Sequence, residues 1–174
     1  CALPISWDMP ISRRLSFSEF ANHVGTHSPE HVQALLAQMT PRAHLAILLQ
    51  EAACCGDVRA IEAVVAHLGP CRACHEALTL AAEEGHLAAV RALIPSGHPS
   101  GNHSEALVSA AIKGHVDIVA ALIPVSQPKA DDSAALRMAT QLGNTDVVEL
   151  LLPVSDPTAN HSEAFLTAIR EEWW

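Results

Sequence analysis

Apolar residues in this chain fall in short runs with helical spacing, and each run ends at a glycine or a proline. One such run starts just after Ser104, which is placed to cap a helix, with Glu105 near the positive end of the helix dipole. Gly114 predicts the end of that helix, as a left-handed residue. A second helix is expected from about His115 to Pro124. The positions predicted to be buried are Leu107, Ala110, Ala111, Ile118, Val119, Leu122 and Ile123.

The same pattern recurs every 29 residues. Neither helix of a unit is long enough to be stable alone, so each unit must bury its apolar side against its neighbours. The sequence therefore predicts an all-α fold, an α-solenoid of helix-turn-helix repeats. Three positions carry the repeat: Gly56, Gly85, Gly114 and Gly143; Leu49, Leu78, Leu107, Leu136 and Phe165; and Ala52, Ala81, Ala110, Ala139 and Ala168.

This period divides the chain into an N-terminal segment and an array. The segment, 1–45, is expected to contain degenerate capping helices. Ser28-Pro29 and Thr40-Pro41 each predict a helix start, because an N-cap residue is followed by proline at the first helical position. Residues 15–39 are predicted to form a degenerate first unit. The expected repeats are 46–74, 75–103, 104–132, 133–161 and a partial unit, 162–174.

Prolines mark the predicted ends of the second helices, at Pro95, Pro124 and Pro153. Simple loops are expected to follow them, at 95–103, 124–132 and 153–161. At the far end, Trp173 and Trp174 are expected to cover the last exposed face of the stack.

Composition agrees with stacked helices. The 174 residues are 49% hydrophobic but only 3% aromatic, without tyrosine, which favours a core of Ala, Leu, Val and Ile over a β-sandwich. A net charge of −9 disfavours binding to a nucleic-acid backbone. The chain has neither an initiator Met nor a signal-peptide layout, and no apolar run of membrane-spanning length. We therefore expect a fragment of a longer soluble protein, with its five cysteines mostly reduced.

Two segments, "LAAEEGHLAAVRALI" at 80–94 and "SAAIKGHVDIVAALI" at 109–123, resemble the core of the ankyrin repeat. The resemblance extends from Ala46 to Trp174 and places His86 and His115 in the Gly-His position of that family, where a structural role is expected. The period differs from the usual value of about 33 residues. The "TPLH" opening of the family is replaced by "SEAL" at 104–107 and "SEAF" at 162–165. This replacement predicts simple loops in place of β-hairpin fingers.

An acidic, Ala-rich ankyrin fragment is also similar to the repeat domains of bacterial type III effectors. One such group, the OspC/CopC-like effectors, carries a C-terminal ankyrin domain behind an ADP-riboxanase domain and recognises host caspases. That resemblance implies a host caspase, or another host signalling protein, as partner. It also implies a location in the bacterial cytoplasm before secretion into the host cytosol.

The segment "CRACH", residues 71–75, has the C-x-x-C-H form of a haem attachment site and half the ligands of a zinc site. In the 29-residue register it is a loop-to-helix junction, which disfavours haem. Zinc would need further ligands. Cys54 and Cys55 are the nearest other cysteines in the sequence, but they are expected at the end of their helix that lies away from residues 71–75. We therefore expect no metal or cofactor, although Cys71, Cys74 and His75 with an imported ligand remain an alternative.

The sequence favours a monomeric module that binds another protein, one with a basic patch, rather than nucleic acid or a membrane. Two alternatives stay open. The chain could be part of an enzyme, through a Cys74–His75 pair or a catalytic domain outside it, or it could be a structural spacer. We expect no catalytic residue here. By analogy with the concave ankyrin surface, partner contacts are expected at Thr79, Glu83, His98, His103, Val108, Ile112, Gln127, Lys129, Asp132, Arg137, Gln141, Asp156 and His161.

Overall fold

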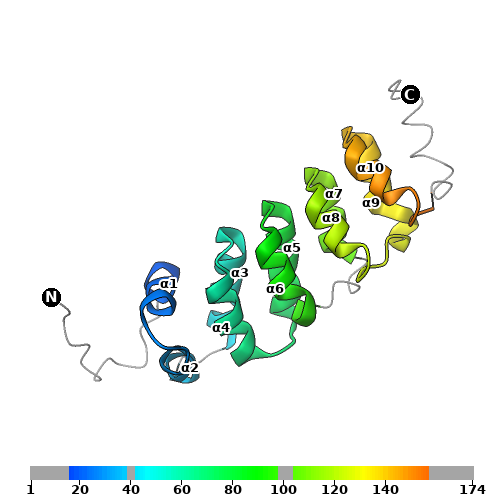
Figure 1. Cartoon of the computed structure of the whole chain (residues 1–174). Helices are drawn as coiled ribbons and strands as arrows, with labels where there is room; N and C mark the ends of the chain where they lie inside the picture. Colours follow the sequence, from blue (N-terminus) through cyan, green and yellow to red (C-terminus); the bar gives the residue numbers. More distant parts are fainter. Residues whose placement is uncertain (1–15, 39–41, 98–103, 157–174) are drawn as a thin grey trace.

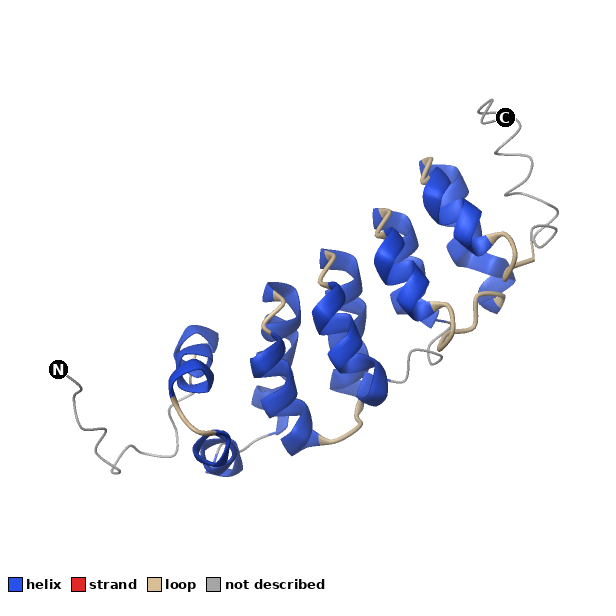
Figure 2. Ribbon diagram, viewed as in Figure 1, coloured by secondary structure: helices blue, strands red, loops and turns tan. Residues whose placement is uncertain are grey.

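The computed structural model describes residues 16–38, 42–97 and 104–156 (Figure 1). Within these ranges the chain forms helices joined by turns and short loops, with no strand (Figure 2). None of these helices combines the length and the apolar character that crossing a lipid bilayer requires. The helices are α1 (Phe17–Thr26), α2 (Pro29–Gln38), α3 (Arg42–Cys55), α4 (Val58–Leu68), α5 (Arg72–Glu84), α6 (Leu87–Gly97), α7 (Glu105–Lys113), α8 (Val116–Leu122), α9 (Ala130–Leu142) and α10 (Thr145–Leu151).

The helix pairs stack side by side in a row (Figure 1). The first helices α3, α5, α7 and α9 form one layer, in which each helix contacts the next. The second helices α4, α6, α8 and α10 form the other layer in the same order, and α1 and α2 pack at the end of the stack against α3 and α4. This arrangement confirms the predicted all-α solenoid.

One continuous core runs between the two layers. The leucine and alanine positions of the first helices are buried from α3 to α9, as the 29-residue period predicts. In the second helices Ile118, Val119 and Leu122 are buried, whereas Ile123 is only partly buried because it lies just beyond the end of α8. Burying a leucine side chain contributes about 1.5–3 kcal/mol. Since each helix pair exposes apolar surface unless a neighbour covers it, the stack depends on these contacts between repeats.

The repeated glycines end the first helices in the left-handed conformation. Gly114 has φ 76° and ψ 24°, and its N–H donates to the carbonyls of Ala110 and Ala111. Gly85 and Gly143 have nearly the same angles. The predicted role of this glycine position is confirmed, since a residue with a Cβ is disfavoured at such a φ.

The predicted helix-capping role of Ser104 is wrong. Ser104 does precede α7, but it is left-handed, with φ 59°, and its side chain makes no capping hydrogen bond. Its Oγ instead accepts from the backbone N–H of Gln127, at 2.7 Å. Ser133 also has a positive φ, 57°, but lies inside α9, which begins one turn earlier, after Lys129. The Oγ of Ser133 accepts from the N–H of Asp156, at 2.9 Å. Both serines therefore hold a loop 23 residues further along the chain.

Two of the predicted loops begin or end differently. Pro95 lies inside α6, which continues to Gly97, so this proline does not end the helix. A proline in a last turn removes one N–H from a helix end whose carbonyls are already short of partners, and the helix tolerates it there. Residues 130–132 are helical as well, because α9 begins at Ala130. The ends of α8 and α10, at Leu122 and Leu151, do precede Pro124 and Pro153.

The N-terminal helices begin with clear signals. Ser16 and Glu19 form a capping box at the start of α1. The predicted start at Ser28-Pro29 is confirmed, since α2 begins at Pro29. The predictions for Thr40-Pro41 and for Trp173 and Trp174 fall outside the described residues.

Candidate functional site

The layer of first helices presents two rows of side chains that differ from repeat to repeat. Helices α3, α5, α7 and α9 occupy equivalent places in the 29-residue register, so one position on each forms a row across the layer. Most of these side chains are half-buried, and those of Cys54 and Gln141 are exposed. We call the eight residues the first-helix face. Its rows are Gln50, Thr79, Val108 and Arg137, and Cys54, Glu83, Ile112 and Gln141.

The middle of the first-helix face is apolar. Val108 and Ile112 lie one turn apart on α7, and both are half-buried. Val108 also packs against the core. The equivalent residues on α5 and α9 are polar or charged. The face thus has an apolar centre with polar flanks, the distribution that protein interfaces use.

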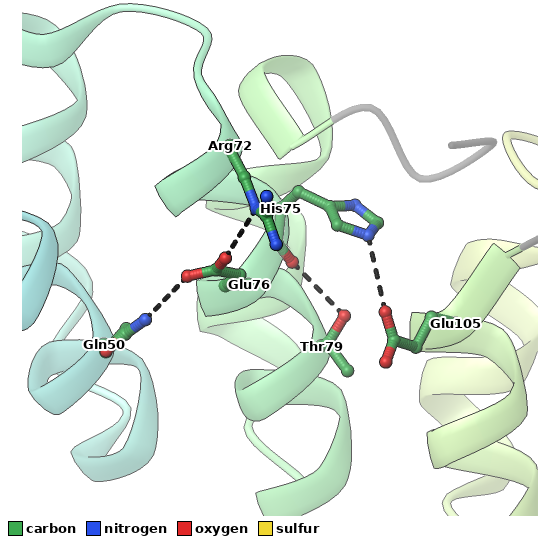
Figure 3. A network of polar contacts seen from close by, with 6 residues as sticks. All are labelled: Gln50, Arg72, His75, Glu76, Thr79 and Glu105. Atoms are coloured by element: carbon green, nitrogen blue, oxygen red, sulfur yellow. Dashed lines mark hydrogen bonds and ion pairs between the residues drawn. The ribbon is translucent and has the colours of Figure 1, made fainter. Parts of the chain in front are cut away.

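Polar contacts link α3 to α5 beside this face (Figure 3). The Glu76 carboxylate accepts from Gln50 Nε2 on α3 and from Arg72 Nε one turn earlier on α5, each at 2.9 Å. The Arg72 side chain is 91% exposed and that of Glu76 42%, so water screens the ion pair and it contributes little to stability. The contacts fix where the carboxylate lies more than they stabilise the fold.

A similar set of contacts links α5 to α7. Glu83 Oε1 lies 3.3 Å from Lys113 Nζ, and both side chains are about half exposed. His75 Nε2 lies 3.7 Å from Glu105 Oε2, an ion pair when the imidazole is protonated (Figure 3). Thr79 Oγ1 donates to the carbonyl of His75, at 3.2 Å. Two of the predicted partner-contact residues, Thr79 and Glu83, therefore already have partners within the molecule.

The side chains at the start of α6, α8 and α10 connect successive repeats. His86 Nε2 donates to the carbonyl of Cys54, and His115 Nε2 to that of Glu83, at 2.9 and 3.0 Å. A carbonyl can only accept, so these bonds place a proton on Nε2 in both rings. At the next position Asn144 Nδ2 donates to the carbonyls of Ala111 and Ile112, at 2.7 and 3.0 Å. The histidines of the Gly-His segments are structural, as expected.

The structure brings together only part of the predicted partner-contact set. Five of its members lie on the first helices half-buried, and Gln141 lies there exposed. Gln127, Lys129 and Asp156 are exposed in the turns, where the amides of Gln127 and Asp156 are bound by Ser104 and Ser133. The backbone of Asp132 lies in α9, and its side chain is outside the described part. The three predicted histidines, His98, His103 and His161, are outside the described residues.

Sequence reasoning missed several residues in the first-helix face and beside it. Extending the 29-residue register back to the 46–74 unit would have found Gln50, which matches Thr79. Glu76 and Glu105 also share one register position. No sequence signal pairs them with Gln50 and His75, because those contacts depend on how neighbouring helices are offset.

The "CRACH" segment starts α5, with Cys71 as the N-cap residue. Cys74 is fully buried, and its Sγ lies 3.3 Å from Cys71 Sγ and donates to the carbonyl of Gly69, at 3.4 Å. Burial, followed by the hydrogen bond with Cys71, raises the pKa of Cys74 to about 12.

These contacts bear on the alternatives of a metal site and a catalytic pair. The Cys74 thiol is held by Cys71 and Gly69, whereas His75 lies beside Glu105, so the structure does not join thiol and imidazole as nucleophile and base. Cys54 and Cys55 end α3, and among the described residues no group of three or more His, Cys, Asp or Glu side chains is placed to hold a metal ion. Desolvation by the neighbouring chain and the nearby Glu84 carboxylate raise the pKa of Cys54.

Comparison with known proteins gives one family. Residues 78–162 match the family model described as ankyrin repeats (3 copies). No curated protein matches the chain. The matched residues include the Gly-His segment at 85–86 and its counterpart at 114–115, whose histidines connect neighbouring repeats. Ankyrin repeats are generally modules of protein–protein interaction. Over residues 78–162, just under half of its length, the chain is therefore similar to ankyrin repeats.

Proposed function

We propose that this chain recognises another protein through its first-helix face. The observation that carries the proposal is the contrast between two sets of register positions. The core positions keep the same chemistry in every repeat, whereas the first-helix face changes from Gln50 and Thr79 to Val108 and then Arg137. A repeated scaffold with a non-repeated face gives a partner a distinct surface to recognise.

The apolar pair Val108 and Ile112 is the proposed anchor point of the partner. Half-buried apolar side chains at the centre of an interface lose the rest of their water on binding, and the surrounding polar residues exclude solvent. We expect the partner to present an apolar side chain here. Because residues at a well-packed centre dominate binding energy, substitutions here should have larger effects than substitutions at the loop positions.

Charge supports a partner with a basic patch. The chain carries a net charge of −9. Four carboxylates lie on α3 and α5 around the first two repeats of the face, and the nearby positive side chains are Arg72 and Lys113. The four carboxylates are Glu51, Glu76, Glu83 and Glu84. The negative potential of this surface speeds the encounter with a positively charged partner more than it tightens the final complex.

The test compares two substitutions in the same repeat. Ile112→Asp places a charge at the centre of the first-helix face, and Ala120→Asp places the same charge on an exposed position of α8, in the other layer. Each chain is used to capture proteins from eukaryotic cytosol, with mass spectrometry as the readout. Circular dichroism and the melting temperature check that both variants keep the parent fold.

We expect a partner that binds the parent and the Ala120→Asp chain and binds Ile112→Asp at least about tenfold more weakly. Loss of the partner from both variants would move the contact surface away from the first-helix face. If no protein is captured specifically, or if charge reversals such as Glu83→Lys and Arg137→Glu change nothing, the chain is a spacer and the proposal fails.

The finer hypothesis is that this chain is the target-binding part of a bacterial type III effector whose partner is a host caspase or another host signalling protein. It rests on the resemblance to effector repeat domains. In this hypothesis any ADP-riboxanase activity belongs to a domain outside these residues. Direct titration of purified caspases with the parent and Ile112→Asp chains tests it, and absence of binding by the parent rejects it.

A further inference from the structure

The two cysteines at the start of α5 form a pre-aligned dithiol. Cys71 is the N-cap residue of the helix, and Cys74 lies in its first turn. Their Sγ atoms are 3.3 Å apart. A disulfide requires about 2.05 Å, so the sulfurs need to approach by only about 1.3 Å. Because Cys71 precedes the regular part of α5, it can make this movement without breaking the helix.

The two sulfurs differ in access. Cys71 is partly exposed, so a reagent in solution can reach it. Cys74 is fully buried and donates its proton to the carbonyl of Gly69. Burial raises the pKa of Cys74 to about 12, which keeps that thiol protonated while both cysteines are reduced. Thiol–disulfide exchange with a reagent in solution therefore starts at the accessible thiol, and the neighbouring sulfur is in place to attack the mixed disulfide that forms.

We propose that Cys71 and Cys74 form a reversible disulfide by exchange with a low-molecular-weight disulfide such as oxidised glutathione. The Cys71 thiolate attacks one sulfur of the reagent, whose S–S bond breaks, and one glutathione leaves as thiolate. The Cys74 sulfur, its proton lost to solvent, then attacks Cys71 Sγ and releases the second glutathione. The protein loses two electrons and two protons, and the reagent becomes two thiols.

The other described cysteines provide an internal comparison. Cys54 and Cys55 are consecutive residues in the last turn of α3, and both are exposed. Consecutive Cα atoms are about 3.8 Å apart, below the usual range for a disulfide of roughly 4.4–6.8 Å. If access to solvent alone decided which pair forms a disulfide, Cys54 and Cys55 would form it. The distance between the sulfurs instead favours a disulfide between Cys71 and Cys74.

The experiment uses the full chain with Cys1, Cys54 and Cys55 replaced by serine. It is incubated with oxidised glutathione, and the products are followed by intact mass and by thiol alkylation. We expect a single chain that is lighter by two hydrogen atoms, with a peptide map that joins Cys71 to Cys74. Dithiothreitol should restore both thiols. The glutathione equilibrium constant should be at least about tenfold larger for the native chain than in denaturing urea, since the fold holds the sulfurs together.

Two further variants on this background separate the roles of the sulfurs. Cys74→Ser should stop at a stable glutathione adduct on Cys71, and Cys71→Ser should react at least about tenfold more slowly. Both substitutions suit the fold, since serine is a good N-cap residue at 71 and at 74 can donate to the Gly69 carbonyl as the thiol does. Circular dichroism verifies this.

Three results would overturn the proposal. The first is a chain that keeps both thiols in oxidised glutathione. The second is a glutathione adduct on Cys71 that persists although Cys74 is present. The third is an equilibrium constant that is the same in the native chain and in urea, which would show that the fold does not align the pair.

Discussion

Gly114→Ala tests the junction between successive repeats. Gly114 is left-handed, with φ 76°, and a residue with a Cβ in that conformation costs about 1–2 kcal/mol. The added Cβ would also lie 3.1 Å from Asn144 Oδ1 and 3.3 Å from its Cγ, closer than ordinary contact allows. Asn144 therefore has to move.

Moving Asn144 has a cost that the structure specifies. Its Nδ2 donates to the carbonyls of Ala111 and Ile112, at 2.7 and 3.0 Å. A hydrogen bond of this kind contributes about 0.5–1.5 kcal/mol, so a shift of Asn144 that weakens or breaks both bonds costs up to about 3 kcal/mol. With the backbone strain, Gly114→Ala should lower the free energy of unfolding by about 1–5 kcal/mol. Gly114→Val, which adds a branched side chain, should cost more.

A double-mutant cycle with Asn144→Ala separates the two terms. The free energy of unfolding is measured by urea titration with circular dichroism for the parent, both single variants and the double variant. In the Asn144→Ala background Gly114→Ala should cost only the backbone strain, about 1–2 kcal/mol. An equal cost of Gly114→Ala in both backgrounds would refute the assignment of a repeat-to-repeat contact at this glycine.

Two other predictions concern strain and charge. Ser104→Ala should lower the free energy of unfolding by about 1 kcal/mol, because the hydrogen bond from the Gln127 amide is lost. Ser104→Gly should cost less, because glycine relieves the strain of the positive φ. The opposite order of stability in urea titration would contradict this prediction. Burial, then the neighbouring His27 and His31, lower the pKa of His23 from 6.5, although Glu19 opposes them. The folded state thus favours the neutral ring. The contribution of His23 to the free energy of unfolding is therefore fully present above pH 6.5 and is lost as the pH falls below that value. The melting temperature should drop on acidification and drop less in His23→Gln; equal pH profiles would refute the role of His23.

The helix pairs could be predicted from the sequence because the repeat multiplies a weak signal. One helical stripe such as Leu107 and Ala110 is ambiguous, but its return at 29-residue intervals with a glycine after it is not. The glycine position was predicted correctly for the same reason, since Gly114 has a single simple role at a helix end. Repetition thus stands in for the tertiary contacts that a single segment does not reveal.

The serine position shows where sequence reasoning fails. A serine followed by glutamate, as at Ser104, has the chemistry of an N-cap. The side chain instead binds the amide of Gln127, at the cost of a left-handed backbone. The choice depends on where the loop returns 23 residues later, and no local pattern contains that information. The contacts around Gln50 and Glu76 were missed for a related reason, because they join different repeats.

The connections between repeats also explain how the first-helix face can vary. Three of the face residues hold the stack through their backbone carbonyls. His86 binds the carbonyl of Cys54, His115 that of Glu83, and Asn144 that of Ile112. None of these bonds involves the side chain of the face residue. Its side chain can therefore change from a carboxylate to an apolar group while the connection stays the same. For this reason we expect Ile112→Asp to weaken recognition at least about tenfold without the loss of stability that Gly114→Ala produces. The first substitution replaces a side chain that the repeat junction does not use, and the second displaces the junction itself.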